Sequence, residues 1–370
     1  MSKLFTPLQV GRVQLAQRIA MAPMTRFRAD DSHVPLPIVR DYYEQRASVP
    51  GTLIVTEGTF ISARAGGYRN IPGIYTPEQI AAWRSIVDAI HAKGSFAYLQ
   101  LWALGRAANP DVLKEEGPYD FVSSSPVPIN PDAPAKPREL TEDEIWAFVG
   151  DYAQAARNAI AAGFDGVEIH AANGYLIDQF IQDTCNRRTD AWGGSVEKRA
   201  RFALEVTKAV VDAVGADRTG IRLSPWSTFQ GMRMADPVPQ FSYLAQKLAE
   251  FKLAYVHVVE SRIAGNADIE SGDSLDFFFD AYPPAAGPVL VAGGYTGPSA
   301  KEAVDVRYKN HDVVIAFGRP FTSNPDLPFR VREGIEFRPF EREYFYVPKS
   351  EKGFADYPFC DEFLKARASI

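Results

Sequence analysis

The chain has little cysteine, little histidine and no long apolar run, and each shortage excludes a class of protein. Its 370 residues contain two cysteines, Cys185 and Cys360, so neither a disulfide framework nor a cysteine-rich metal site is expected. The five histidines, at positions 33, 91, 170, 257 and 311, show no metal-ligand spacing, which disfavours a metal-dependent aldolase or hydrolase. No segment approaches the ~18 consecutive apolar residues of a membrane-spanning helix.

Positive charge is also in short supply. The 40 Lys and Arg against 46 Asp and Glu give a net charge of −6 and a pI of about 5.5. Neither nucleic acid nor an anionic membrane surface is therefore indicated as a partner. The first residues lack the apolar core of a signal peptide, and the low cysteine content fits a reducing compartment, so we expect a cytoplasmic protein that acts on a small molecule.

Short apolar runs of β-forming residues recur along the chain, and helical patterns follow most of them. Eight such units predict a (β/α)8 TIM barrel that forms a single domain over residues 1–370. A doubly wound open sheet is the alternative, but no G-x-G-x-x-G motif follows the first run. The eight predicted strands are Ile19–Pro23, Thr52–Glu57, Phe96–Leu101, Gly166–His170, Thr219–Leu223, Ala254–Val259, Val289–Ala292 and Val313–Phe317.

The helical patterns and three further segments complete the predicted barrel. Leu4–Leu15 reads as a small hairpin that plugs one end. The Pro- and Ser-rich stretch Arg106–Leu140 is too long for a plain connection, and we expect it to extend over the barrel mouth as a lid. We expect it, together with Ser261–Tyr282, to control which substrates fit. The predicted helices are Pro77–Lys93, Thr141–Ala162, Val196–Val214, Phe241–Phe251, Pro298–Tyr308 and Pro328–Glu333.

Polar residues gather just after the fourth predicted strand. That strand ends in His170, and Asn173 and Tyr175 follow at a spacing of H-x-x-N-x-Y. The histidine and the asparagine can each donate one N–H to the same oxygen, while a nearby phenol can supply a proton, which suits reduction of an activated double bond. The alternative reading is a strand-end histidine with a satisfied ring, a turn asparagine and a core tyrosine.

Other strand ends predict a site for a phosphate and a flat ring. Glycines after the seventh strand, Gly293 and Gly294, and Gly318-Arg319 after the eighth occupy the usual phosphate position of these barrels. Around the centre, a hydroxyl, a glycine, an amide and a cation suit a planar heterocycle with carbonyl and N–H edges: Thr25, Gly58, Gln100 and Arg222. Taken singly, each of these residues also fits a turn, a buried amide or an ion pair.

Several motifs together resemble the Old Yellow Enzyme family, whose members are FMN-dependent ene-reductases on a (β/α)8 barrel. The resemblance runs from about Leu4 to Tyr357. It also extends to filamentous-fungal members, including enzymes that act on chanoclavine aldehyde in ergot alkaloid assembly. The motifs are M-A-P-M-T (21–25), T-E-G (56–58), L-Q-L-W (99–102), H-A-A-N-G-Y-L (170–176), R-R-T-D-A-W-G-G-S (187–195), F-G-R (317–319) and S-N-P-D-L-P (323–328).

The resemblance implies a role for each candidate residue. His170 and Asn173 would bind a carbonyl or nitro oxygen of the substrate, and Tyr175 would donate the proton. The ring of FMN would lie against Pro23, Thr25, Gly58, Gln100 and Arg222, and its phosphate against Gly293, Gly294, Gly318 and Arg319. Tyr68, Trp102, Phe229 and Tyr346 would shape the substrate pocket.

The expected function is reduction of the activated C=C bond of an α,β-unsaturated aldehyde, ketone or nitroalkene, with NADPH or NADH as the hydride donor. Two alternatives stay open. The chain resembles enzymes that reduce or isomerise chanoclavine-I aldehyde, and a flavin-bearing barrel can also serve as a ligand-binding protein with little turnover. We expect a monomer or a homodimer.

Overall fold

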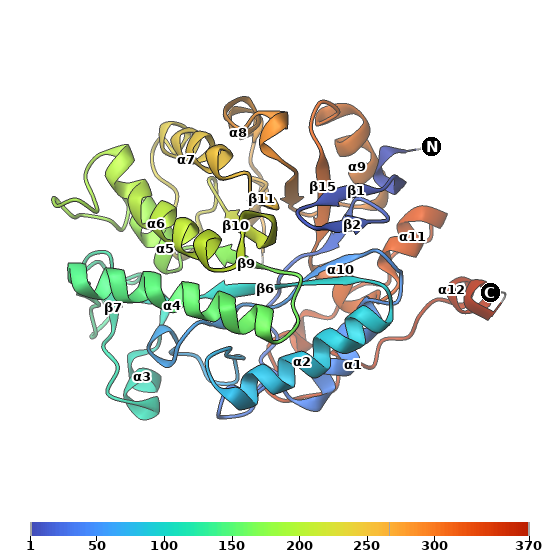
Figure 1. Cartoon of the computed structure of the whole chain (residues 1–370), viewed down its shortest axis with the longest axis horizontal. Helices are drawn as coiled ribbons and strands as arrows, with labels where there is room; N and C mark the ends of the chain where they lie inside the picture. Colours follow the sequence, from blue (N-terminus) through green and yellow to red (C-terminus); the bar gives the residue numbers. More distant parts are fainter. Residues whose placement is uncertain (1, 266, 369–370) are drawn as a thin grey trace.

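The computed structural model describes residues 2–265 and 267–368 and contains a closed barrel of eight parallel strands (Figure 1). Neighbouring strands pair in chain order. The ring closes where β15 pairs with β3, Phe317 opposite Met21. The predicted fold is therefore confirmed. The barrel strands are β3 (Ile19–Met21), β4 (Leu53–Val55), β6 (Phe96–Trp102), β9 (Gly166–His170), β10 (Thr219–Leu223), β11 (Tyr255–Val259), β14 (Val289–Ala292) and β15 (Val313–Phe317).

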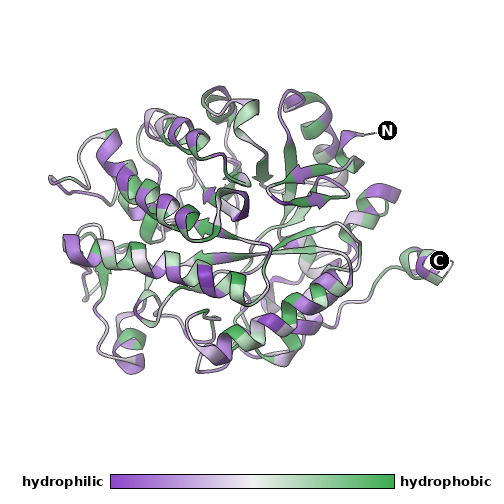
Figure 2. Cartoon of the chain, in the orientation of Figure 1, coloured by the Kyte–Doolittle hydropathy of each residue, from purple (hydrophilic) through white to green (hydrophobic). Residues whose placement is uncertain are grey.

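Helices surround this barrel, and their apolar faces turn toward the strands (Figure 2). Three begin with capping boxes: Thr76 with Gln79, Thr141 with Glu144 and Thr296 with Ser299. One helix was predicted to start at Phe241 but starts at Val238. The outer helices are α1 (Pro37–Arg46), α2 (Pro77–Ala92), α4 (Glu142–Ala161), α6 (Val196–Val214), α7 (Val238–Phe251), α8 (Asp276–Ala281), α9 (Gly297–Glu302) and α11 (Leu327–Glu333).

Shorter elements lie at the ends of the barrel and in its connections. The C-terminal helix α12 stands away from the barrel at the end of an extended stretch (Figure 1). No helix among the described residues is long and apolar enough to cross a membrane. The remaining strands are β1 (Leu8–Val10), β2 (Val13–Leu15), β5 (Thr59–Phe60), β7 (Val122–Ser123), β8 (Arg138–Glu139), β12 (Ile263–Ala264) and β13 (Ala267–Asp268), and the remaining helices are α3 (Pro110–Glu116), α5 (Leu176–Ile181), α10 (Arg319–Ser323) and α12 (Asp361–Ala368).

The predicted hairpin plug is confirmed. Strands β1 and β2 pair antiparallel with Leu8 opposite Leu15. Their apolar side chains share one buried cluster with inward-facing residues of the barrel, including Leu53, Leu290 and Val314. The hairpin therefore closes the amino-terminal end of the barrel, which leaves the carboxyl-terminal end for a ligand.

The expected lid is not found. None of the described residues that line the cavity at the barrel mouth comes from 106–140. This segment instead packs beside the barrel, where the hydroxyls of Ser123 and Ser124 donate to Gln179 and the carbonyl of Leu140 accepts from Arg188. The segment contains α3 and the β7–β8 pair, and these contacts hold it away from the opening.

Candidate active site

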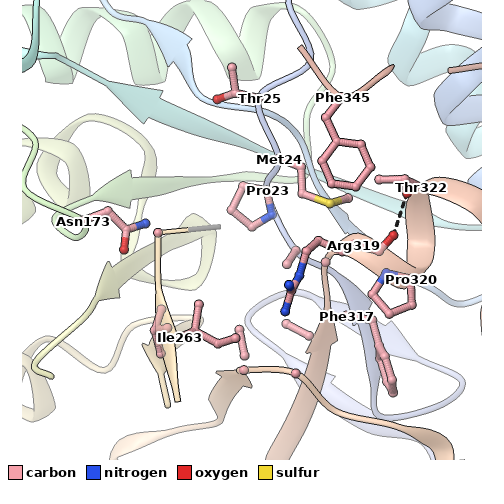
Figure 3. A pocket seen from close by; sticks show the side chains of 18 of the residues that line it. Pro23, Met24, Thr25, Asn173, Ile263, Phe317, Arg319, Pro320, Thr322 and Phe345 are labelled. Atoms are coloured by element: carbon pink, nitrogen blue, oxygen red, sulfur yellow. Dashed lines mark hydrogen bonds between the residues drawn. The ribbon is translucent and has the colours of Figure 1, made fainter. Parts of the chain in front are cut away.

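A cavity of about 710 Å³ opens at the carboxyl-terminal end of the barrel. Figure 3 shows part of its wall, with Pro23 and Met24 between Asn173 on one side and Phe345 on the other. The structure brings together every predicted site residue except Gly58. The predicted residues that line the cavity are Pro23, Thr25, Tyr68, Gln100, Trp102, His170, Asn173, Tyr175, Arg222, Phe229, Gly293, Gly294, Gly318, Arg319 and Tyr346.

Gly58 lies behind the cavity wall. A Cβ atom at this position would come within 2.5 Å of the indole ring of Trp102. The glycine therefore allows Trp102 to pack closely against the backbone, and a direct contact between Gly58 and a cofactor stays a prediction.

The turn after β9 holds the polar residues in an unusual backbone conformation. Asn173 and Gly174 are consecutive and both have positive φ, 57° and 75°. Three hydrogen bonds fix this turn: the N–H of Asn173 donates to the Ser224 hydroxyl (2.7 Å), the N–H of Gly174 donates to the Asp178 carboxyl (2.8 Å), and the Gly174 carbonyl accepts from Gln179 (2.8 Å). Side chains from three other positions thus stabilise the conformation that aims Asn173 into the cavity.

His170 is a neutral donor. Burial, with the nearby charge of Arg222, lowers the pKa of its imidazole well below the ordinary value. The backbone N–H of Ala172 donates to Nδ1 at 3.3 Å, so Nδ1 is an acceptor and the proton is assigned to Nε2. The indole of Trp102 lies nearly parallel to the imidazole, with ring centroids 6.0 Å apart. His170 therefore offers one N–H to a ligand without a positive charge.

Tyr175 packs edge-on against two of these rings. Its centroid lies 4.8 Å from that of Trp102 and 5.0 Å from that of His170. Burial raises the pKa of its hydroxyl above the ordinary value of 10.0, and the nearby Tyr68 and Tyr346 raise it further. The phenol is therefore protonated across the physiological pH range.

Glu168 organises the polar floor of the cavity, and the sequence analysis missed it. Its carboxyl accepts hydrogen bonds from the amide of Gln100 (2.8 Å), the hydroxyl of Tyr255 (3.0 Å) and Nδ1 of His257 (2.8 Å). Burial opposes its ionisation, but His257, Arg222 and these hydrogen bonds lower its pKa below the ordinary value. An inward-facing acid in an apolar strand, V-E-I-H, is the signal that could have identified it.

Arg222 also lines the cavity, and its guanidinium has N–H groups that can donate to a ligand. No hydrogen bond of its guanidinium is found among the described residues, and its buried Nε atom has no partner there. Burial lowers its pKa, while Glu168 opposes that shift. A half-buried cation that lines a cavity and has a buried, unsatisfied N–H group is suited to a ligand with electron-rich acceptor atoms.

The opposite end of the cavity carries the predicted phosphate residues. Gly293 has a φ of 151°, and a Cβ there would lie 2.4 Å from Cβ of Glu260, so only glycine fits. Arg319 presents its two terminal nitrogens to the two carboxyl oxygens of Asp268, a geometry that also suits phosphate. With Ile263 and Gly265, Asp268 brings part of the segment 261–282 to the cavity, and its control of which substrates fit stays a prediction.

The roof of the cavity is aromatic, and sequence reasoning found only one of its residues, Tyr346. The clustering of aromatic residues in the C-terminal tail was the available signal. The tail residues that line the cavity are Phe337, Phe340, Phe345 and Tyr346. Because the tail lacks the strand-and-helix repeat of the barrel, no pattern predicted where it would lie.

Comparisons with known proteins show which family the chain belongs to. The sequence model of the NADH:flavin oxidoreductase / NADH oxidase family matches residues 3–338. Chanoclavine-I aldehyde reductase fgaOx3 from Penicillium roqueforti (strain FM164) is 68% identical over 366 residues, which cover 99% of each chain. The probable inactive reductase easA from Epichloe festucae var. lolii is 52% identical over 369 residues, 98% of this chain and 97% of that protein.

A solved structure of this family has the same fold. The crystal structure of Old Yellow Enzyme from Pichia sp. AKU4542 superposes with a TM-score of 0.89 at 40% identity, over 97% of this chain and 94% of that one. The matching fold and the sequence identity agree. The chain therefore belongs to the Old Yellow Enzyme family of flavin oxidoreductases.

Proposed function

We propose that the protein binds FMN in this cavity and reduces the activated C=C bond of an α,β-unsaturated aldehyde, ketone or nitroalkene, with NADPH or NADH as the hydride donor. One observation carries the proposal. His170, Asn173 and Tyr175 converge on the same cavity as a half-buried cation, Arg222, whose buried Nε–H has no partner among residues 2–265 and 267–368. Two donors, an acid and a site for an electron-rich ring thus lie together.

The residues of the cavity fit FMN. Pro23, Thr25, Gln100 and Arg222 would hold the ring, because they offer an apolar face, a hydroxyl, an amide oriented by Glu168 and a cation. The phosphate would be held by Gly293, Gly294, Gly318 and Arg319. Bare backbone and a bidentate guanidinium are the usual partners of such a group. Bound FMN would supply the redox chemistry, taking a hydride from NADPH or NADH and delivering it to the β-carbon of the substrate.

The chain's own residues handle the substrate oxygen and the proton. His170 donates from Nε2, and Asn173 donates from its amide, to the carbonyl or nitro oxygen, and they stabilise the negative charge that grows there during reduction. Since His170 is neutral, it polarises this oxygen without transferring a proton. Tyr175 holds its proton until the α-carbon becomes basic enough to accept it.

Chanoclavine-I aldehyde is the candidate physiological substrate, because the 68% identical relative is a chanoclavine-I aldehyde reductase. Net reduction is favoured over isomerisation, since the chain has Tyr175 as the proton donor. A flavoprotein with little turnover is the second candidate, supported by the relative named as a probable inactive reductase. The convergence of His170, Asn173 and Tyr175 favours an active enzyme. A cytoplasmic location and a monomeric or homodimeric state stay predictions.

The proposal is tested on the purified protein. We expect a yellow protein that releases FMN on denaturation, is bleached by NADPH under nitrogen and regains its colour when an enone or chanoclavine-I aldehyde is added. A simple phenol should produce a long-wavelength charge-transfer band. Colourless protein that does not bind added FMN would contradict the cofactor assignment. Bleaching without reoxidation by any enone, enal or nitroalkene would favour the low-turnover candidate.

A further inference from the structure

The C-terminal strap, residues 344–354, forms part of the cavity roof but belongs to no strand or long helix. Phe345 and Tyr346 of the strap line the cavity, and the ring of Tyr346 packs edge-on against Phe27, with centroids 5.9 Å apart. Among the described residues, one backbone–backbone hydrogen bond joins the strap to a distant segment, from Lys349 N–H to the Phe27 carbonyl at 2.9 Å. Something other than regular secondary structure must therefore hold the roof.

Three buried arginines do so. Arg26, Arg28 and Arg46 are at most 1% exposed, and each donates to main-chain carbonyls of the strap. The guanidinium of Arg28 donates to three of these carbonyls, those of Tyr344 (3.0 Å), Phe345 (2.8 Å) and Ser350 (2.8 Å). Arg26 donates to Phe345 (3.2 Å) and Gly353 (2.7 Å), and Arg46 donates to Phe354 (3.1 Å).

Aromatic packing accompanies these hydrogen bonds. The Phe354 ring stacks on Tyr42 with centroids 4.0 Å apart. The guanidiniums of Arg26 and Arg28 lie 5.0 and 4.8 Å from the centre of the Phe354 ring. The buried acid beside them, Glu57, accepts the backbone N–H of Arg26. The positive charges are thus stabilised mainly by carbonyl dipoles and rings rather than by matched acids.

The arginines also connect the roof to the opposite wall. Arg26 and Arg28 follow directly after Pro23, Met24 and Thr25, which line the cavity where the flavin ring is proposed to lie. Figure 3 draws Phe345 of the strap and Met24 of this loop as parts of the same cavity wall. One loop therefore carries the residues that face the ring and two of the three guanidiniums that hold the roof. The height of the roof thus depends on the length of these two side chains and on the two-pronged shape of their guanidinium groups.

We propose that Arg28, with Arg26, is a positioning residue that sets the clearance between the Phe345–Tyr346 roof and the proposed flavin plane, and thereby selects substrates by thickness and bulk. This inference rests on the proposed function, because it takes the cavity as the substrate site. A loosened roof would lose contact with a compact enone, so the KM for that substrate rises. The same roof would admit a bulkier enone more readily, so the ratio of the two kcat/KM values changes.

The test compares Arg28→Gln with Arg40→Gln, a matched control whose arginine is exposed and, within the described part of the chain, pairs only with Asp41 and Glu44. Two readouts are measured: the rate of trypsin cleavage at the exposed Lys349 and Lys352, and kcat and KM for cyclohexenone and for a bulky aryl enone. For Arg28→Gln we expect cleavage about tenfold faster, as loss of about 1.4 kcal/mol would give. We also expect at least a fivefold shift of kcat/KM toward the bulky substrate, mainly through KM, with FMN content unchanged.

Each outcome is decisive. If the strap is cleaved faster but the substrate ratio stays at the wild-type value, Arg28 serves stability alone and the inference is wrong. Unchanged cleavage would also overturn it. If Arg28→Gln fails to fold, Arg28→Lys is measured in the same way. Lysine keeps the positive charge but lacks the several N–H groups of the guanidinium, so an intermediate shift in both readouts is expected. The cleavage assay does not require flavin, so failure of FMN to bind contradicts the proposed function and is distinguished from failure of the strap inference.

Discussion

Tyr175 shows how burial prepares a single residue for its proposed task. A phenol that has to donate a proton must keep it until the carbon acceptor becomes basic, and burial raises the pKa of this hydroxyl above its ordinary value of 10.0. The same burial lowers the pKa of His170, so the neighbouring ring donates a hydrogen bond but carries no charge. One apolar environment thus assigns different roles to two adjacent polar groups.

Replacing Tyr175 by Phe should separate the two half-reactions. Loss of the proton donor is expected to slow reoxidation by an enone on the order of 10²–10⁴-fold, because positioned acids typically contribute that much. Bleaching of the flavin by NADPH involves no proton from Tyr175 and should change little. Stopped-flow absorbance under nitrogen measures both steps. Equal slowing of both would contradict the assigned role.

Replacing Ser224 tests whether ligand binding requires the hydrogen bond that holds the backbone of Asn173. In Ser224→Ala the N–H of Asn173 loses its acceptor in a positive-φ conformation. The loss of about 1 kcal/mol should weaken binding of a phenol about fivefold, measured by titration of the charge-transfer band. Ser95→Ala, which removes a buried hydroxyl bonded to Ala47 elsewhere in the barrel, is the control and should leave the titration unchanged.

At the scale of elements, the strand-and-helix repeat was predictable because each barrel strand is an apolar run followed by an amphipathic helix. His170 and Arg222 could be located because they lie at or next to the last residues of strands β9 and β10, and strand ends converge in a barrel. The position of the segment 106–140 was not predictable. Its place beside the barrel depends on single hydroxyl and carbonyl contacts to Gln179 and Arg188. Such contacts produce no repeating pattern in the sequence from which they could be predicted.

Helix α5 carries a buried acid, Asp178, whose ionisation should change the stability of the protein with pH. Burial raises the pKa of Asp178 from the ordinary 3.8 to about 7. Because the folded state holds this proton more tightly than the unfolded state, the contribution of the group favours folding at low pH and is lost as pH rises between about 4 and 7. At about 1.4 kcal/mol per pH unit, the ionised carboxyl costs about 4 kcal/mol above pH 7.

Asp178→Asn removes this pH dependence. The amide can still accept from Gly174 but loses the hydrogen bond from Gln182, so the variant should melt below the wild type at pH 5. By pH 8 the difference in melting temperature should shrink or reverse in favour of Asn. Thermal unfolding followed by circular dichroism at both pH values measures it. A difference that is constant with pH would mean that Asp178 does not titrate in this range.

For the whole molecule, the hairpin plug decides which end of the barrel is open. Gly11 at the hairpin turn has a φ of 54°, and a Cβ there would lie 2.0 Å from the carbonyl oxygen of Asp217. Close approach between the turn and the barrel base therefore depends on the missing side chain. Because the plug closes this end of the barrel, the hydride donor and the substrate must enter through the opening at the other end. Under the proposed function they therefore bind one after the other.

Gly11→Ala should destabilise the protein by about 1–3 kcal/mol, since the new methyl group both clashes with the base and disfavours the positive φ. The expected result is a melting temperature lower by several degrees with unchanged FMN content at 25 °C. Gly150→Ala is the control: Gly150 lies inside α4 with nothing within 4 Å of the added carbon, so this variant should be as stable as the wild type or slightly more so. Equal effects of the two changes would contradict the role of the plug.

The way the strap is fastened has a consequence for how this protein can change. Arg26, Arg28 and Arg46 grip carbonyl oxygens, and every amino acid has one. A new side chain can therefore be installed at the exposed Tyr346 without removing these hydrogen bonds, whereas the ring of the buried Phe345 also packs on the Arg26 guanidinium. For laboratory evolution of new substrate preferences, Tyr346 offers variety at less risk to folding than Phe345 or the arginines.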